Sequence, residues 1–102
     1  MEHMALTETP YYILLSLYEP LHGYGIMQRA AELSGGRVRL AAGTLYGALN
    51  ALVEKGWITL LPGEGRKKEY RLTPRGLEVL KKELARLREL VASGDLVLKE
   101  EA

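Results

Sequence analysis

The sequence predicts a mainly helical domain with a small β-hairpin, an α+β arrangement, followed by one further helix at the C-terminal end. Three observations predict it. Apolar residues recur at helical spacing in four segments, two short strand-like runs flank a loop with two glycines, and proline or glycine separates the segments. A chain of 102 residues is long enough for one such domain.

The first helix is predicted from Ile13, Leu14 and Leu17, which share one helical face. We expect it to end near Tyr18. Pro20 prevents an easy continuation, because it restricts the residue before it and has no N–H to donate.

A second helix is predicted by Ile26, Ala30 and Leu33, which follow each other at steps of four and three residues. The glycine pair at 35–36 predicts its end, because glycine readily takes the left-handed conformation that closes a helix. Residues 37–40 (RVRL) alternate charged and apolar side chains, which predicts a brief strand.

The third helix is expected from about Ala42 to Lys55. Its predicted buried stripe consists of Leu45, Leu49, Leu52 and Val53. A rotation of about 100° per residue puts small, uncharged residues on the opposite face. That face consists of Gly43, Gly47, Asn50 and Ala51, with Thr44 and Tyr46 beside it. A helix that lies closely in a groove benefits from such a surface.

The hairpin is predicted from the runs WITLL and EYRLT, which Gly56 separates from the third helix. The loop between the two runs, PGEGRKK, ends in the consecutive basic residues Arg66, Lys67 and Lys68. The densest positive charge of the chain is therefore expected at the tip of the hairpin.

The C-terminal helix is predicted to start at Thr73-Pro74, a capping residue followed by proline at the first helical position. Its apolar residues recur at alternating steps of three and four, as in a heptad seam for a second chain. They are Leu77, Leu80, Leu84, Leu87 and Val91. Packing of one edge of this stripe on the first helix of the same chain, in a monomer, is the alternative. We expect the seam to end at 93–94, so that residues 1–73 form one unit and 74–102 a dimerisation helix with a tail.

Charge is distributed unevenly along the chain, although the net charge is only +1. Residues 1–34 carry a net charge of −3, residues 35–75 of +5 and residues 76–102 of −1. A positive patch in the middle segment favours a polyanionic partner, with an ordinary solvated surface as the alternative.

Little in the sequence indicates catalysis. The chain has no cysteine, and its two histidines, His3 and His22, are too few and too scattered for a metal site. The hairpin loop lacks the spacing of a nucleotide-binding loop. We therefore expect no enzyme activity, no cofactor and no metal. The absence of cysteine and of any long apolar run predicts a cytoplasmic protein without a membrane span.

The order helix, helix, short strand, helix, hairpin matches a winged helix-turn-helix. In that fold the third helix enters the major groove of DNA and the hairpin, or wing, lies along the backbone. The basic hairpin tip would then reach phosphates, where release of counterions favours binding. Arg37 and Arg39 precede the third helix on its other side.

Three blocks also resemble the PadR-type transcriptional regulators: LHGYGI at 21–26, GTLYGALNALVEKGWI at 43–58 and RKKEYRLTPRG at 66–76. The resemblance extends over residues 6–92 and implies a dimeric repressor whose C-terminal helix mediates dimerisation, often with a small-molecule effector. Family members often have Ser-Pro where this chain has Ala41 and Ala42. The loss of a hydroxyl cap costs about 1 kcal/mol of helix stability and removes one phosphate contact.

The resemblance places Thr44 and Tyr46 at the DNA and Tyr24 close to a phosphate. Together with the helical face and the basic residues, this predicts a set of DNA-binding residues. They are Tyr24, Arg39, Gly43, Thr44, Tyr46, Gly47, Asn50, Arg66, Lys67 and Lys68. Partial burial with an exposed hydroxyl is the alternative for Tyr24 and Tyr46.

The sequence thus predicts a sequence-specific DNA-binding regulator, a homodimer on an inverted-repeat operator. One alternative is a winged-helix module that uses its third helix to bind another protein. Another is a ligand-sequestering dimer without a gene target, although the seam helix offers no aromatic residue for stacking.

Overall fold

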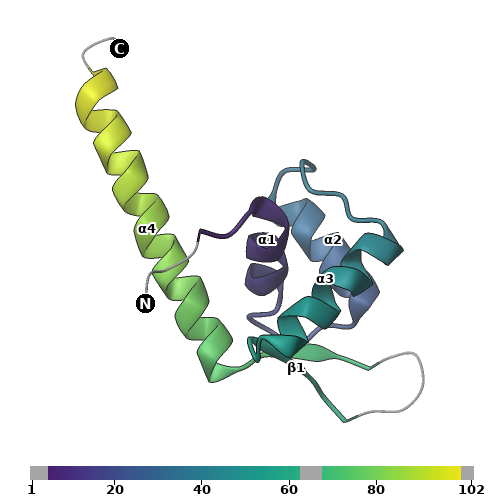
Figure 1. The fold of residues 1–102 in the computed structure, drawn as a ribbon. Helices are drawn as coiled ribbons and strands as arrows, with labels where there is room; N and C mark the ends of the chain where they lie inside the picture. The colour runs from purple at the N-terminus through teal and green to yellow at the C-terminus, as the bar shows by residue number, and fades with distance from the viewer. Residues whose placement is uncertain (1–4, 63–67, 100–102) are drawn as a thin grey trace.

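The computed structural model describes residues 5–62 and 68–99, and within them it has four helices and one two-stranded antiparallel hairpin (Figure 1). The elements are α1 (Glu8–Ser16), α2 (Gly23–Leu33), α3 (Ala42–Glu54), β1 (Ile58–Leu60), β2 (Tyr70–Leu72) and α4 (Pro74–Leu98). The predicted fold class, mainly helical with a small hairpin, is confirmed.

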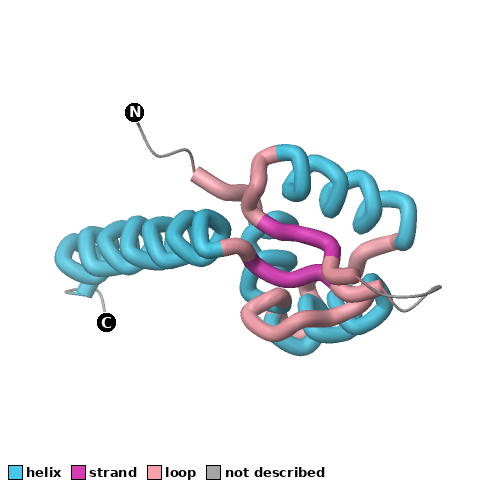
Figure 2. The backbone as a smooth tube through the Cα atoms, turned by 90° about the horizontal axis from the view of Figure 1, so that it is seen from below, coloured by secondary structure: helices cyan, strands magenta, loops and turns pink. Residues whose placement is uncertain are grey.

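The first three helices and the hairpin form one unit, and α4 extends away from it (Figures 1 and 2). The chain is elongated as a result, with extents of 56 × 33 × 20 Å. The two functional regions expected from the sequence, the third helix and the far end of α4, therefore lie in different parts of the molecule.

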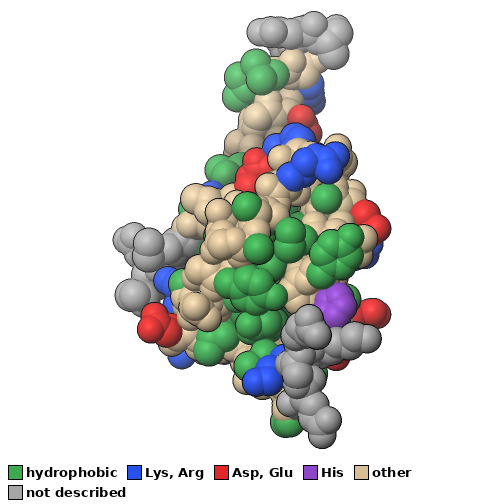
Figure 3. Space-filling view, turned by 90° about the vertical axis from the view of Figure 1, so that its right-hand side faces the viewer, with side chains coloured by type: hydrophobic (Ala, Val, Ile, Leu, Met, Phe, Trp, Pro, Cys, Tyr) green, Lys and Arg blue, Asp and Glu red, His purple; other side chains and the backbone are tan. Residues whose placement is uncertain are grey.

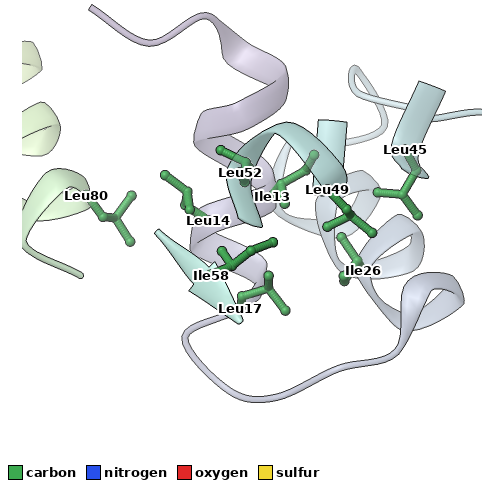
Figure 4. Close-up of a cluster of buried hydrophobic side chains, with 9 residues drawn as sticks. All are labelled: Ile13, Leu14, Leu17, Ile26, Leu45, Leu49, Leu52, Ile58 and Leu80. Carbon is green, nitrogen blue, oxygen red and sulfur yellow. The ribbon is translucent and has the colours of Figure 1, made fainter. Parts of the chain in front are cut away.

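The core lies where α1, α2, α3, β1 and the first turns of α4 meet (Figure 4). It consists of Ile13, Leu14, Leu17, Ile26, Leu45, Leu49, Leu52, Ile58 and Leu80. Burial of one such side chain contributes about 1.5–3 kcal/mol. Val53, expected in the buried stripe of α3, is exposed instead, since the 100° step moves it to the edge of that face.

The hairpin pairs Ile58 with Leu72 and Leu60 with Tyr70. Residues 37–40, predicted as a brief strand, form no strand in the described structure. Their backbone is held locally instead, with the Val38 N–H donating to the Ser34 hydroxyl at 2.8 Å. Leu21 takes the place beside β2. It exchanges two backbone hydrogen bonds with Tyr70, of 3.1 and 2.9 Å, and this links the hairpin to the start of α2.

Helix α4 continues through residues 93–94 to Leu98, beyond the predicted end. Gly94 does not adopt the left-handed conformation that would close the helix, and an interior glycine costs a helix only about 1 kcal/mol. Residues 95–98 thus also belong to α4, and among them Leu96, Val97 and Leu98 are exposed. At the other end, Leu80, expected at a dimer interface, is 6% exposed and lies in the core of its own chain.

The start of α4 is fixed to the hairpin at the backbone of residues 56–57. The Thr73 N–H donates to the Trp57 carbonyl at 3.0 Å, and the Thr73 hydroxyl donates to the Gly56 carbonyl at 2.6 Å. The same hydroxyl accepts from the Gly76 N–H at 3.0 Å, which is the predicted N-cap. Gly76 lies directly against the Trp57 carbonyl, and any Cβ at this position would collide with that oxygen.

Gly76→Ala should therefore lower the free energy of unfolding by about 1–3 kcal/mol, because a methyl group would have to displace backbone rather than a mobile side chain. Gly47→Ala is the matched control. It also lies inside a helix, but its Cβ would meet no side chain or neighbouring element within 4 Å among the described residues. That change should raise stability by about 0.8–1 kcal/mol. Urea unfolding in the absence of DNA measures both, and equal effects of the two substitutions would contradict the packing argument.

Candidate nucleic-acid interface

The outward face of α3 is an exposed, uncharged surface along the first half of the helix. Gly43, Thr44, Gly47 and Asn50 are all exposed, and Leu45 and Leu49 hold the opposite face in the core. At the two glycines, an added Cβ would meet nothing within 4 Å among the described residues. A large, flat partner can therefore approach the backbone of α3 closely.

The amino-terminal end of α3 has the predicted weak cap. Ala41 occupies the N-cap position, and alanine has no side-chain acceptor for the free N–H groups of the first turn. The residues of this turn, Ala42 to Thr44, are exposed, and so is Arg39, whose guanidinium lies over Gly36. This end of α3 therefore presents donors and positive charge, which suit an anionic group.

The amino-terminal end of α2 lies close by and exposes an aromatic side chain. Tyr24, the second residue of α2, is 65% exposed. His22 caps the helix, since its Nδ1 accepts a hydrogen bond from the Gly25 N–H at 3.0 Å. His22 therefore has a structural role as a helix cap.

Gly23 and Tyr46 are in contact, with Tyr70 nearby, and we call the three residues the tyrosine junction. The Tyr46 hydroxyl lies against Gly23, so a Cβ at this position would have to displace the Tyr46 side chain, although Tyr46 remains 46% exposed. Burial raises the pKa of Tyr70, and the nearby Tyr46 hydroxyl raises this pKa further. Each of the three residues comes from a different one of the blocks on which the resemblance rests. The junction thus joins α2, α3 and the hairpin.

The basic side chains around this face divide into two groups. Arg37 is bound within the domain, where its guanidinium forms an ion pair of 2.7 Å with Glu8 and lies 3.5 Å from the Tyr12 hydroxyl. The Glu8 hydrogen bond raises the pKa of Arg37. Lys68 and Arg71, on the hairpin, are exposed. Of the predicted hairpin contacts, Arg66 and Lys67 lie outside the described residues.

The side of the molecule where α2, α3 and the hairpin lie is shown in Figure 3. Hydrophobic side chains, a class that includes tyrosine, gather in the middle of this face, and charged side chains of both signs, Lys and Arg as well as Asp and Glu, lie toward its margins. The basic groups at the margins suit the phosphates that flank a groove of a duplex.

The predicted dimer residues differ strongly in exposure. Leu80 is buried and Leu77 and Leu87 are half-buried, whereas Leu84 is exposed and Val91 is 62% exposed. The apolar residues of α4 therefore fall into two groups. Those of the first turns complete the core of their own chain, and those of the second half, including Leu96, Val97 and Leu98, are exposed in the single chain.

A groove of about 1140 Å³ opens between the segment before α1, one side of α3 and the start of α4. Trp57 lines it, with the Lys55 ammonium 5.1 Å from the centre of the indole ring. Small side chains, Ala48 and Ala51, form part of its wall. Trp57 lies between the end of α3 and the start of β1. The sequence carries no sign that its indole faces a groove, because that depends on the position of α4.

Among the described residues, no cluster of three or more His, Cys, Asp or Glu side chains is arranged to hold a metal ion. None of the helices in this part of the chain is long and apolar enough to cross a membrane.

The sequence profile of the PadR-like family of transcriptional regulators matches residues 13–82, which is well over half of the chain. The chain belongs to this family. The resemblance predicted from the three sequence blocks is confirmed, and it places the protein among regulators rather than enzymes.

Solved PadR-family structures share the fold. A transcriptional regulator from Clostridium thermocellum is 25% identical, with 88% of this chain and 92% of that chain covered and a TM-score of 0.74. A PadR-like transcription factor from Bacteroides fragilis is 28% identical over 86% of this chain and 87% of its own, with a TM-score of 0.73. Bacillus subtilis PadR, solved in complex with operator DNA, is 31% identical over 74% of this chain and 45% of that one, with a TM-score of 0.62.

One curated sequence is also similar, an uncharacterized 37.1 kDa protein from a transposon of Streptomyces fradiae. The two are 44% identical over 64 residues, which make up 63% of this chain. The matched part is only 18% of the transposon protein, so this PadR-family chain spans a small fraction of that relative.

The tyrosine junction can be tested without DNA. Gly23→Ala should lower stability by about 0.5–1.5 kcal/mol, because the Tyr46 side chain must leave its preferred position to admit the methyl group. In a Tyr46→Ala background the same change should cost nothing. Urea unfolding of the two single variants and the double variant gives the coupling energy, expected at about 0.5–1.5 kcal/mol. An unchanged cost in the Tyr46→Ala background would show that another contact restricts Gly23.

Proposed function

We propose that this PadR-family protein is a sequence-specific DNA-binding regulator that inserts α3 into the major groove of duplex DNA. The observation that carries the proposal is the exposed face of α3, which is small and uncharged and which, beside Gly43 and Gly47, meets no other element among the described residues. A solvated surface helix usually carries lysine and glutamate on such a face. Bacillus subtilis PadR, a similar protein, was solved in complex with operator DNA, which supports DNA as the partner here.

Base reading and phosphate binding fall to different residues. The Asn50 side chain, exposed on the groove-facing side of α3, carries an amide that can pair with adenine by two hydrogen bonds. Thr44 and Tyr46 lie nearer the amino-terminal end of the helix. In this proposal the exposed Arg39 and Lys68 bind phosphates, where they add affinity without reading the sequence.

The protein acts as a dimer in this proposal, and the exposed second half of α4 supplies the interface. Leu84, Val91 and Leu98 follow each other at seven-residue steps and form an exposed stripe that water would otherwise surround. In a two-fold dimer both copies of α3 face the same side of the duplex. The operator would then be an inverted repeat with half-sites about 34–36 Å apart, one helical turn.

Repression relieved by a small molecule completes the proposal. The groove beside Trp57 combines an aromatic ring, small apolar walls and the cationic Lys55, and it lies between α3 and α4. A ligand in this position would alter the relation between the DNA-binding face and the dimerisation helix. Trp57 is the one tryptophan of the chain, so its fluorescence reports on the occupancy of the groove.

The decisive experiment is in-vitro selection of bound DNA from a random pool, followed by binding measurements with variants of Gly47. Gly47→Glu places bulk and negative charge on the groove face and should abolish binding to the selected site while the fold persists. Gly47→Ala is the matched control, and it should keep most of the affinity. Gel-shift titration and circular dichroism of both variants give affinity and folding. Full binding by Gly47→Glu would mean that this face binds something other than DNA, such as another protein.

The dimer prediction uses two exposed positions, so that the fold of the single chain is spared. Leu84→Glu combined with Val91→Glu should give monomers, because charges at the centre of an apolar interface remain unpaired. Lys82→Glu, at an exposed position on the opposite face of the same helix, is the control for added negative charge. Sedimentation at tens of micromolar distinguishes the states, and operator binding should weaken strongly in the monomer. A monomeric parent with full affinity for one half-site would contradict the proposed architecture.

A further inference from the structure

A buried carboxylate lies on the inner side of α4, at a position that neither the predicted apolar stripe nor the DNA-binding face uses. Glu83 is 1% exposed. Its carboxylate accepts two hydrogen bonds from Arg86, of 2.9 and 2.7 Å, and one from the Leu6 N–H, at 3.1 Å. The pair raises the pKa of Arg86, and the charge of Glu83 contributes to the raised pKa of Tyr11, for which burial is the larger cause.

Stability alone does not account for this arrangement. Removal of an ion pair from water costs so much that well-packed apolar side chains often stabilise a protein as well or better. What a carboxylate adds is direction, since its oxygens require donors at defined positions. Here one donor is the backbone of a residue 77 positions away in the chain.

Besides the core packing of Leu80, polar contacts among the described residues attach α4 to the rest of the chain at two points, and Glu83 is the second of them. The first is the helix start, where Thr73 and Gly76 lie on the Trp57 carbonyl. The second is two turns further on, where Glu83 holds the segment before α1 by its Leu6 N–H, and Leu6 itself packs against the core. Figure 1 shows this segment running from α1 toward α4. Two attachments define the direction of a rod, whereas one leaves it free to tilt.

Beyond these attachments α4 projects from the rest of the chain, so a small change in its tilt displaces its far end. All its residues from Arg88 to Leu98 are exposed in the single chain. The 15 residues after Glu83 extend for about 22 Å at 1.5 Å per residue. A tilt of about 10° at Glu83 would move the far end by about 4 Å, close to the rise of about 3.4 Å between neighbouring base pairs.

We propose that Glu83 is a positioning residue that sets the spacing between operator half-sites. By holding residues 5–7 across α4, it fixes the angle at which the dimerisation helix leaves the DNA-binding unit. In the dimer this angle determines the separation of the two α3 helices. The inference rests on the proposed dimeric DNA-binding function and assigns a specificity role to a residue that contacts neither DNA nor the partner chain.

The test uses the full chain and three variants. Glu83→Gln keeps the side-chain volume and an acceptor for Leu6 but removes the charge. Glu83→Leu with Arg86→Leu replaces the whole pair by apolar groups and is expected to stay folded. Glu32→Gln is the matched control, because Arg29 and Glu32 form an ion pair with the same spacing in sequence on an exposed surface.

The first measurement is amide hydrogen exchange at Leu6 in the absence of DNA. The double-leucine variant should exchange this amide at least about tenfold faster than the parent, because the segment before α1 opens locally. The Glu32→Gln variant should match the parent. Unchanged protection of Leu6 in the double-leucine variant would overturn the attachment, whatever the protein binds.

The second measurement compares affinity for inverted repeats whose half-site separation varies in steps of one base pair. The double-leucine variant should shift the preferred separation by about one base pair or lose the preference, with unchanged affinity for one half-site. Glu83→Gln, which keeps the acceptor for Leu6, should stay close to the parent. A folded, dimeric double-leucine variant that keeps the parent's preference would refute the positioning role. Failure of the parent itself to bind any repeat would instead refute the proposed function, and the Leu6 measurement would still decide the attachment.

Discussion

The carbonyl group of Trp57 is the point on which the arrangement of this protein depends. It ends the turn after α3, accepts the Thr73 N–H, and lies against Gly76 in the first turn of α4. One backbone atom thereby connects the helix that faces DNA in the proposed function with the helix that faces a partner chain. Only glycine at position 76 lets the two backbones approach this closely. Residues 73–76, the N-cap and first turn of α4, are consequently held in a fixed position against Trp57.

The proposed DNA-binding face of α3 consists largely of residues with a very small side chain or none. Glycine at 43 and 47 and alanine at 41 weaken the helix, since they contribute neither a cap nor good helix propensity. The loss is offset by burial of Leu45 and Leu49 on the other side and by the tyrosine junction, which holds α3 to α2 and the hairpin. Contacts on the buried face thus stabilise α3, while the opposite face with Gly43 and Gly47 stays exposed.

The ion pairs on α4 are of two kinds, exposed and largely buried. Surface pairs such as Lys82 with Glu78 are exposed and contribute little to stability. The Glu83–Arg86 pair is largely buried and connects elements far apart in the chain. The groove beside Trp57 has the segment held by Glu83 as one of its walls. Occupancy of the groove and the direction of α4 are therefore physically connected, and this is the requirement for an effector that changes DNA binding through dimer geometry.

The order of elements was readable from the amino-acid sequence alone, because it follows from local signals. Apolar spacing indicated α1 to α3, Gly56 the turn after α3, and Thr73-Pro74 the start of α4. The three blocks that contain Gly23, Tyr46 and Tyr70 indicated the family, because they too are local sequence motifs.

Only the tertiary structure decided which local tendencies prevailed. Residues 37–40 have a strand pattern but no neighbour to pair with, since Leu21 already occupies the edge of β2. Leu80 belongs to the heptad pattern, but because the start of α4 is held at Trp57, the Leu80 side chain packs in the core of its own chain. Glu83 carries no signal in sequence at all, because a glutamate on a charged helix is ordinarily solvated. Its burial depends on Leu6, 77 residues earlier, and a contact at that distance is created by folding rather than by any local pattern.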